Sequence, residues 1–345
     1  MVAFNQTSVE TLELPDFATI PASMPWAFDN TSVALSLGIR TRTLMHLILS
    51  RSTQYTEYKI PKKSGGTRII HAPNRMLKYV QGKVLERYLN VLEYPEHIAA
   101  YVPGRTTRFS AEKHTGKQIL IVMDLKDFFT NTRRSWVRRV FHHHFNYSHY
   151  VSCLLTDLCT LGRAGANGMQ HFVPQGAPTS GAICNWVAHY RIDEPILEIC
   201  KKWEMDYSRY ADDLAFSSHK ILDRRDANRF VREVTQCVKR GGYTVNYKKL
   251  RVTRYNKQQR LLGMTVNEKP NIIRVHYRKL RARLHHCKHK GFDLVATEMG
   301  LESGAQLESQ IAGMISYYHM INPEKAAKLK QQLESVRNGP LLSFV

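Results

Sequence analysis

Residues 207–217 read Tyr-Ser-Arg-Tyr-Ala-Asp-Asp-Leu-Ala-Phe-Ser, two short β-like runs bent at Ala211-Asp212-Asp213. A second apolar run, Ile119–Met123, has the length of a buried strand and ends at Asp124. Each of these aspartates ends or bends a predicted strand, where the backbone presents a side chain rigidly at the edge of a sheet. The pattern therefore predicts three carboxylates held on neighbouring parts of one sheet.

Carboxylates fixed in this way suit one kind of chemistry. Two Mg²⁺ ions about 4 Å apart can activate an attacking hydroxyl and stabilise a leaving pyrophosphate. Holding them takes two or three carboxylates, with phosphate oxygens and water completing the near-octahedral shells. An Asp-Asp pair alone is weak evidence for such a site, so its value depends on the β-like flanks and on the strand-terminal Asp124.

The composition indicates a folded protein with a polyanionic partner. The 345 residues are 43% hydrophobic, which is enough for a sizeable core and excludes disorder as the dominant state. Fifty Lys and Arg against 29 Asp and Glu give a net charge of +21. A balance this basic makes nucleic acid the first candidate partner.

The basic surplus is concentrated between Lys239 and Lys290, which holds sixteen Lys or Arg and one acid, Glu268. Tyrosines are interleaved with these cations, as suits a surface that holds phosphates and stacks on bases or sugars. A merely solvated helical face would carry both signs of charge. We therefore expect this stretch to bind nucleic acid through Lys248, Arg251, Arg254, Arg260, Arg274, Arg278, Lys279, Arg281 and Arg283.

The six cysteines are scattered, with no pair at zinc-knuckle spacing, which argues against a zinc knuckle and a disulfide framework. No apolar run approaches the roughly 20 residues that cross a bilayer, and no secretory signal is visible. We expect a cytoplasmic bacterial protein with no membrane partner.

Hydrophobic periodicity predicts an α+β protein. Helices are expected over 31–52, 75–92, 135–145, 179–203 and 223–240, and in the tail beyond Asn271 with a break at Pro323. Strands are expected over 55–60, 67–71, 119–123, 207–217, 243–246 and 260–266, and a glycine-rich loop over 162–168.

Several motifs, in the order in which they occur along the chain, resemble those of a reverse transcriptase, most closely of the bacterial retron type. Tyr210-Ala211-Asp212-Asp213 matches the YxDD motif, and Asp124-Leu125-Lys126-Asp127-Phe128-Phe129 matches the first palm motif. Pro174-Gln175-Gly176-Ala177-Pro178-Thr179-Ser180 resembles the loop that lines the nucleotide pocket, and residues 242–249 resemble the next motif. Leu261-Leu262-Gly263 stands where a primer-grip hairpin is expected.

The resemblance implies roles for particular residues. Asp124, Asp212 and Asp213 would be catalytic ligands of two Mg²⁺ ions, with Mn²⁺ as a possible substitute, and Lys249 would protonate pyrophosphate. Phe129 would be a steric gate against a ribose 2′-OH, with Gln175 and Gly176 beside the incoming dNTP. The remaining assignments are the cations Arg68 and Lys59, which would clamp the triphosphate, and His114, which would contact template or primer.

The resemblance also implies a right-hand polymerase with fingers, a palm built on an antiparallel sheet, and a helical thumb. The expected divisions are an N-terminal helical extension (1–54), fingers (55–118), palm (119–267, with a fingers-like insertion at about 130–172) and basic helical thumb (268–345).

As a retron enzyme, the chain would bind its own structured noncoding RNA and start synthesis from a guanosine 2′-OH. The product would be a branched RNA–DNA hybrid, multicopy single-stranded DNA (msDNA). Such complexes act in anti-phage defence with an effector protein, and higher-order assembly with nucleic acid is possible.

Three positions depart from the retron pattern: Ser110 stands in place of Asn, Leu261-Leu262-Gly263 in place of Val-Thr-Gly, and Gly181 in place of Pro. The alternatives are a group II-like or abortive-infection reverse transcriptase with different priming, and a nucleic-acid-binding scaffold without catalysis.

Overall fold

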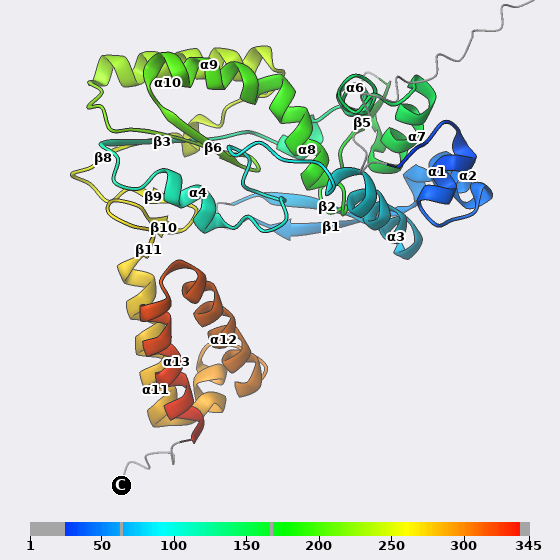
Figure 1. The fold of residues 1–345 in the computed structure, drawn as a ribbon. Coiled ribbons are helices and arrows are strands. Elements are labelled where there is room, and N and C mark those ends of the chain that lie inside the picture. The colour runs from blue at the N-terminus through cyan, green and yellow to red at the C-terminus, as the bar shows by residue number, and fades with distance from the viewer. Residues whose placement is uncertain (1–24, 63–64, 166–167, 339–345) are drawn as a thin grey trace, which may run out of the picture. The chain divides into compact units, whose positions relative to one another are not determined.

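The computed structural model describes residues 25–62, 65–165 and 168–338 (Figure 1). The first 24 residues of the predicted N-terminal extension and the last seven of the predicted thumb lie outside the described residues. The helices are α1 (Asn30–Ser36), α2 (Thr41–Leu49), η1 (Arg51–Thr53), α3 (Arg75–Val84), η2 (Leu85–Leu89), α4 (Thr107–Lys113), α5 (Phe128–Asn131), α6 (Arg134–Arg139), η3 (Val140–His144), α7 (His149–Cys159), α8 (Ser180–Ala188), η4 (His189–Asp193), α9 (Glu194–Trp203), α10 (Arg224–Arg240), η5 (Tyr247–Lys249), α11 (Arg274–Glu298), α12 (Gly304–Ile321) and α13 (Pro323–Asn338). The strands are β1 (Tyr55–Pro61), β2 (Thr67–Pro73), β3 (Ile119–Asp124), β4 (Leu161–Gly165), β5 (Gly168–Phe172), β6 (Asp206–Tyr210), β7 (Asp213–Ser218), β8 (Arg251–Arg254), β9 (Arg260–Leu261), β10 (Met264–Thr265) and β11 (Asn271–Ile272).

The chain divides into two compact units, each made of several segments. Unit 1 contains the described residues up to Gly104, Leu125–Ile199 and Arg232–Val245. Unit 2 contains Arg105–Asp124, Cys200–Val231 and the described residues from Asn246 onward. The four-part division expected from the sequence stays a prediction.

Unit 2 is built on a four-stranded antiparallel sheet in the order β6-β7-β3-β8. All six residues of β3 are buried, which explains why its sequence is an uninterrupted apolar run up to Asp124. Side chains alternate between the two faces of a strand. Ile121 and its partner Phe216 therefore point to one face, and Val122 and its partner Ala215 point to the other.

Each face of this sheet is covered by a different part of unit 2. The Phe216 ring packs edge-on against Phe230 of α10, with ring centroids 5.2 Å apart. On the opposite face, Val122 and Ala215 belong to one buried apolar cluster with residues of β9, β10 and the C-terminal helices. Burial on both faces fixes the register of β3, and with it the position of Asp124 at the end of the strand.

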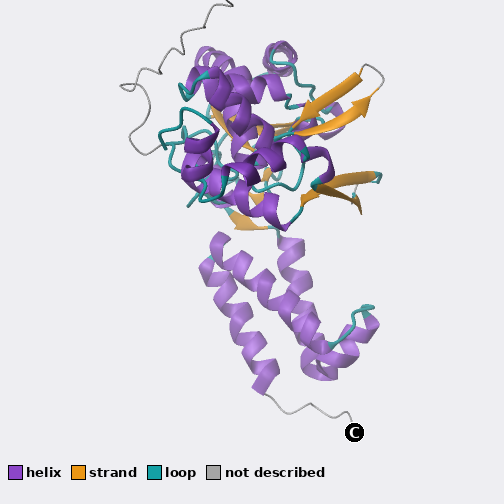
Figure 2. Ribbon diagram, turned by 90° about the vertical axis from the view of Figure 1, so that its right-hand side faces the viewer, coloured by secondary structure: helices purple, strands orange, loops and turns teal. Residues whose placement is uncertain are grey.

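The C-terminal region is a bundle of three helices, α11, α12 and α13, which contact one another along their lengths (Figure 1). In Figure 2 they are the purple helices that precede the end marked C. Leu284, Ile311 and Leu329 contribute to their shared core. Gly291, at φ +80°, kinks α11 where a residue with a side chain would be strained. The predicted helical tail and the break at Pro323 are confirmed.

Unit 1 carries two antiparallel hairpins, β1–β2 and β4–β5, which are among the strands drawn in orange in Figure 2. The first was predicted. The second occupies the segment expected to be a glycine-rich loop, because Leu161 and Phe172 pair at its base and are both buried. Cross-strand pairing thus overrides the low strand propensity of its glycines.

Two other predicted elements differ from the structure, and one strand was not predicted. The single helix over 31–52 is two helices separated at Gly38, which adopts φ +69°. The predicted strand 243–246 makes only an isolated bridge, from Val245 to Leu125. β3 pairs with β7 on one side and with β8 on the other, and β8 was missed because its charged residues at 251 and 254 hide the alternation expected of a strand.

Two further expectations concern cysteines and membranes. All six cysteines are free thiols; five are buried and Cys153 is partly exposed. Within the described ranges, no helix has both the length and the apolar character needed to span a bilayer.

Candidate active site

Asp124 and Asp213 are direct cross-strand partners at the end of the β3–β7 pair. Opposite residues of an antiparallel pair have Cβ atoms about 5 Å apart, so the two carboxyl groups project from one edge of the sheet on the same face. Asp212 lies in the two-residue turn between β6 and β7, where Ala211 takes the left-handed conformation at φ +56°. The turn residues are short, and the tight bend keeps Asp212 next to Asp213.

Two residues of the segment that leads into β8 hold Asp124 in place. Lys249 of η5 forms an ion pair with Asp124 Oδ1. The Asn246 side-chain amide donates to Asp124 Oδ2 at 3.1 Å, and its backbone N–H donates to the Asp124 carbonyl at 2.7 Å. Asn246 was not predicted as a site residue, although it lies within the motif at 242–249.

The carboxylates repel one another and are partly desolvated. Burial, followed by the charges of Asp212 and Asp124, raises the pKa of Asp213 to about 7. The hydrogen bond to Asp124 raises the pKa of Lys249 and keeps this side chain protonated. A cation between the carboxylates would offset their repulsion, so both the donor atoms and their charges suit a hard divalent ion.

The three aspartates do not, however, form the tightest set of metal-capable side chains. Within the described part of the chain, the group whose ligand atoms all lie within 4.8 Å of one another is His97, His189 and Asp193. The aspartates are spread more widely, as an arrangement for two ions with phosphate oxygens between them allows.

The Gln175–Gly176 loop of unit 1 is tied to the β1–β2 hairpin. The His71 backbone N–H donates to the Gln175 carbonyl at 2.8 Å. Gly176 has φ +125°, and a Cβ there would lie 2.8 Å from Ile70 Cγ2 and 3.0 Å from the His71 carbonyl oxygen. Only glycine allows the loop to approach β2 so closely.

The same hairpin separates the two cations expected to clamp a triphosphate. Arg68 pairs with Ile60, whereas Lys59 pairs with Ile69, so Arg68 and Lys59 project from opposite faces. Ile70, two residues after Arg68, is the side chain that faces Gly176. Arg68 therefore shares the face of the Gln175 loop and Lys59 does not, which contradicts the expectation that both bind one triphosphate.

Phe129, the expected steric gate, lies in α5 and contacts an aromatic residue that the sequence did not single out. Its ring meets Tyr101 edge-on, with centroids 6.2 Å apart. The Tyr101 ring also covers Gly181 at the start of α8, so a Cβ at Gly181 would collide with it. This contact explains why glycine replaces the expected proline. No motif marks Tyr101, which lies in an irregular segment at φ +55°.

His114 is not available to nucleic acid. It is completely buried, and its two ring nitrogens lie 2.8 Å from the hydroxyls of Ser217 and Ser208. Burial lowers the pKa of His114 to about 3, so the ring is neutral. The prediction that His114 contacts template or primer is therefore wrong: this residue links α4 to the β6–β7 hairpin.

The basic residues expected to bind nucleic acid lie on the surface of unit 2. All are exposed except Arg283, which is half-buried: Lys248, Arg251, Arg254, Arg260, Arg274, Arg278, Lys279, Arg281 and Arg283. Leu280 and Leu284 of α11 are buried between them. The alternation explains how one helix can join the apolar core and still present a basic face.

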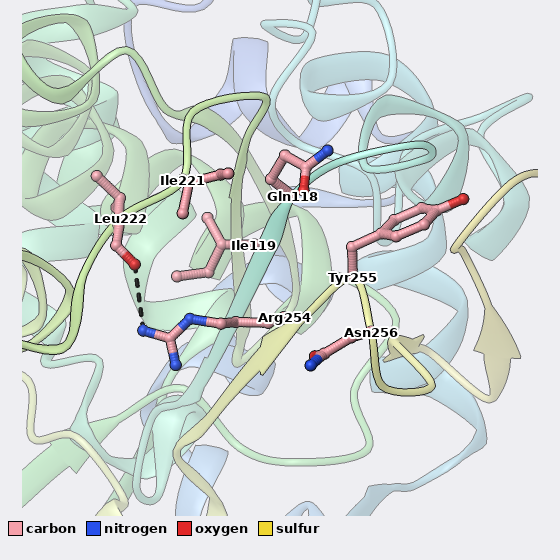
Figure 3. A pocket seen from close by; sticks show the side chains of 7 residues that line it. All are labelled: Gln118, Ile119, Ile221, Leu222, Arg254, Tyr255 and Asn256. Atoms are coloured by element: carbon pink, nitrogen blue, oxygen red, sulfur yellow. Dashed lines mark hydrogen bonds between the residues drawn. The ribbon is translucent and has the colours of Figure 1, made fainter.

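Arg254 also borders a pocket of about 230 Å³, drawn in Figure 3. The pocket lies at Ile119, the opposite end of β3 from Asp124, and the Arg254 guanidinium donates to the Leu222 carbonyl at 3.2 Å. The pocket is therefore separated from the three carboxylates by the length of β3.

Comparisons with known proteins agree on one family. Residues 60–266 match the family described as reverse transcriptase (RNA-dependent DNA polymerase). The chain is 31% identical to the Retron Mx65 reverse transcriptase of Myxococcus xanthus, over 92% of this chain and 74% of that protein. It is also 31% identical to the Retron Mx162 reverse transcriptase of the same organism, over 89% of this chain and 67% of that protein.

The Retron Ec86 reverse transcriptase of Escherichia coli is 29% identical, over 72% of this chain and 74% of that protein. Among solved structures, telomerase from Candida albicans in complex with a fragment of telomeric RNA gives a TM-score of 0.42 at 13% identity. That match covers 82% of this chain and 63% of the telomerase chain.

Proposed function

This chain belongs to the reverse transcriptase family and, within it, to the retron enzymes, and on that premise we propose that it copies part of a cognate structured noncoding RNA into single-stranded DNA. It has the reverse-transcriptase fold and is an RNA-directed DNA polymerase. Enzymes of this family use divalent metal ions. Beyond the family, fold and activity, we propose the identity of the metal ion, the residues that bind it, the primer and the biological role.

The observation that carries the catalytic proposal is the pairing of Asp124 with Asp213 at the strand ends, with Asp212 in the adjoining turn. In our proposal these carboxylates bind two Mg²⁺ ions, and Mn²⁺ can substitute. When bound, the ions would lower the pKa of the attacking hydroxyl and stabilise charge on the leaving pyrophosphate. Lys249, held protonated next to Asp124, is the proton donor to pyrophosphate.

For the incoming dNTP, we assign three side chains of unit 1. Phe129 excludes a ribose 2′-OH, Gln175 offers an amide to the nucleotide, and Arg68 neutralises the triphosphate. Gly176 belongs to the same set because it lets the loop approach β2. Lys59 is left out, since it projects from the other face of the hairpin.

The basic face of α11 and the segment before it would hold the RNA template and the growing product. Contacts from arginine and lysine to phosphates are strong but independent of sequence. Retron membership supports priming from a guanosine 2′-OH, which gives a branched RNA–DNA molecule, msDNA. It likewise supports a role in anti-phage defence together with an effector protein.

The first experiment tests polymerase chemistry on purified protein. We expect extension of a DNA primer on an RNA template with dNTPs and Mg²⁺, and at least a 1,000-fold loss in Asp213→Asn, about 4 kcal/mol of transition-state stabilisation. Asp226→Asn, an exposed aspartate of α10, is the matched control and should retain activity. Normal synthesis by Asp213→Asn would overturn the metal assignment.

The second experiment tests priming in cells that express the chain with its flanking DNA. We expect a discrete short DNA that is joined to RNA and is altered by debranching treatment, and that is absent with Asp212→Asn. If purified enzyme extends primers but this species does not form, the proposal of 2′-OH priming fails while the polymerase assignment stands.

A further inference from the structure

A second group of metal-capable side chains lies in unit 1 and shares no residue with the aspartates of the palm. It consists of His97, in the irregular segment after η2, and His189 and Asp193, at the two ends of η4. Asp193 is completely buried, His97 is 5% exposed and His189 is partly buried. One ligand atom from each residue lies within 4.8 Å of the other two.

The separation between two of these ligand atoms fits one tetrahedral ion. His97 Nε2 lies 3.3 Å from Asp193 Oδ2. Ligands about 2.1 Å from a tetrahedral zinc ion are separated by about 3.4 Å. The neighbouring Glu194 lies beside this group, with its Oε1 3.8 Å from His189 Nε2, and a rotation of its side chain would make it the fourth donor. Two imidazoles and two carboxylates make a complete set for Zn²⁺.

The backbone explains how three of these residues reach the same side of one helix. Residues 180–203 run through α8, η4 and α9 without a break, and η4 is a single turn of π-helix. In an α-helix, residues four apart share a face, whereas a π turn bonds residues five apart. The π turn therefore brings both Asp193 and Glu194, four and five residues after His189, near that ring. Such turns are frequent at functional sites.

Charge also favours a cation at this position. A fully buried carboxylate such as Asp193 is costly unless it is compensated. A buried ion pair between His97 and Asp193 accounts for the contact between those two groups alone. His189 and Glu194 form a second ion pair, whereas a divalent ion would account for the convergence of both imidazoles and Asp193 on one point.

We propose that His97, His189 and Asp193, with Glu194 as the fourth ligand, bind one structural Zn²⁺ ion. Zinc is favoured over Mg²⁺ because two of the four donors are imidazole nitrogens. The site joins the irregular segment that contains His97 to the long helix of residues 180–203.

The site would stabilise the segment that leads to Tyr101. Tyr101 lies four positions after His97, and between them the Ala100 carbonyl accepts a 2.7 Å hydrogen bond from the Asn185 side chain. Tyr101 then covers Gly181 and contacts Phe129. A metal at His97 would therefore fix one end of a short segment whose other end supports the ring beside Phe129.

The test uses full-length protein without a polyhistidine tag, dialysed against metal-free buffer. Elemental analysis should find about one Zn²⁺ per chain, reduced at least tenfold in His97→Gln and Asp193→Asn. His143→Gln, an exposed histidine of the same unit, should keep its zinc, and so should Asp212→Asn, which tests the catalytic set separately. A strong chelator should lower the melting temperature of wild type, and Zn²⁺ but not Mg²⁺ should restore it.

Because His97→Gln or Asp193→Asn could fail to fold, a second measurement uses the wild type. Co²⁺ added to chelator-treated protein should give the visible absorption of a tetrahedral site with nitrogen and oxygen ligands, and Zn²⁺ should abolish it. Absence of zinc, of this absorption and of any chelator effect would overturn the proposal and leave a metal-free ion pair. Loss of zinc in His143→Gln would also overturn it, because the metal would then be bound by surface histidines.

Discussion

The protonation of Asp213 links the stability of the palm to pH and to metal binding. Its pKa in the fold, about 7, lies above the ordinary value of 3.8 because burial and two neighbouring carboxylates disfavour the charged form. Between these two values the folded protein holds a proton that the unfolded chain has released. The free energy of unfolding of the metal-free enzyme should therefore fall as pH rises from about 4 to about 7.

Asp213→Asn removes this penalty together with the catalytic carboxylate. Near pH 8 and without metal, the variant should melt at a higher temperature than wild type, while near pH 5 the two should be similar. Thermal denaturation in a chelator at both pH values measures the difference. Asp226→Asn serves as the exposed control. Equal melting temperatures at pH 8 would show that Asp213 ionises without cost.

The contact between Gly181 and Tyr101 predicts a second effect of a single residue. Gly181→Ala places a methyl group against the Tyr101 ring, so we expect a loss of stability of about 1–3 kcal/mol and weaker use of dNTPs. Denaturant unfolding and the kcat/KM for single-nucleotide addition check both expectations.

The matched control is Gly313→Ala in the exposed part of α12, where a Cβ meets nothing within 4 Å. This variant should be as stable as wild type or more stable by about 0.5–1 kcal/mol. Adding Tyr101→Ala to Gly181→Ala should recover part of the lost stability. Strictly additive effects would argue against the contact.

Among the elements, the β6–β7 hairpin depends on a polar group buried beneath it. His114→Ala removes the ring that joins Ser208 to Ser217 and leaves a cavity, so we expect a loss of about 2–4 kcal/mol. The ring is neutral in the fold, so the contribution of His114 to the free energy of unfolding should be fully present above pH 6.5. This contribution should decrease as the pH falls below 6.5.

Chemical denaturation of His114→Ala across this pH range is the measurement. Its affinity for RNA should keep the salt dependence of wild type, because His114 contacts no solvent. A reduced salt dependence would restore His114 to the nucleic-acid surface.

On helix α11 we expect the reverse of His114→Ala: a substitution that weakens RNA binding and leaves stability unchanged. Arg278 is exposed on a helix whose apolar side is buried, so Arg278→Gln should leave the unfolding free energy within about 0.5 kcal/mol of wild type. The slope of log affinity for RNA against log salt should decrease by about 0.7–0.9 for the lost phosphate contact. Lys201→Gln, an exposed change on α9, should leave the slope unaltered and serves as the control. An unchanged slope in Arg278→Gln would remove this face from the RNA surface.

For the molecule as a whole, the sequence predicted those features whose signal is local. The apolar run before Asp124, the bend at Ala211–Asp213 and the helical tail each depend on a short pattern, and each lies where it was expected. Features that depend on contacts between distant residues were missed. Strand β8 owes its existence to pairing with β3, and the exposed Arg251 and Arg254 conceal it.

The same reason explains the unexpected site residues. Tyr101 becomes significant only because folding places it over Gly181, 80 positions later in the chain. His114 was assigned to template or primer on the family resemblance, and only its burial and its bonds to Ser208 and Ser217 show its role inside the fold. Lys59 and Arg68 could be assigned to faces only when the register of the hairpin was known.

The interleaving of the two units predicts how the molecule unfolds. The chain passes between them repeatedly, and α9 and α10 each contribute residues to both. Neither unit can form from one continuous segment, so we expect a single cooperative transition in calorimetry, with equal calorimetric and van't Hoff enthalpies. Two resolved transitions would show that the units unfold independently.

The distribution of thiols makes the chain well suited to fluorescence spectroscopy. Five of the six cysteines are buried, and Cys153 is only partly exposed. A single new cysteine at an exposed position of α12, together with Cys153→Ser, would react with a maleimide dye far faster than the buried thiols. A second exposed cysteine introduced in the same way would give a pair of dyes that reports movements of the C-terminal helices, one molecule at a time, during each round of DNA synthesis.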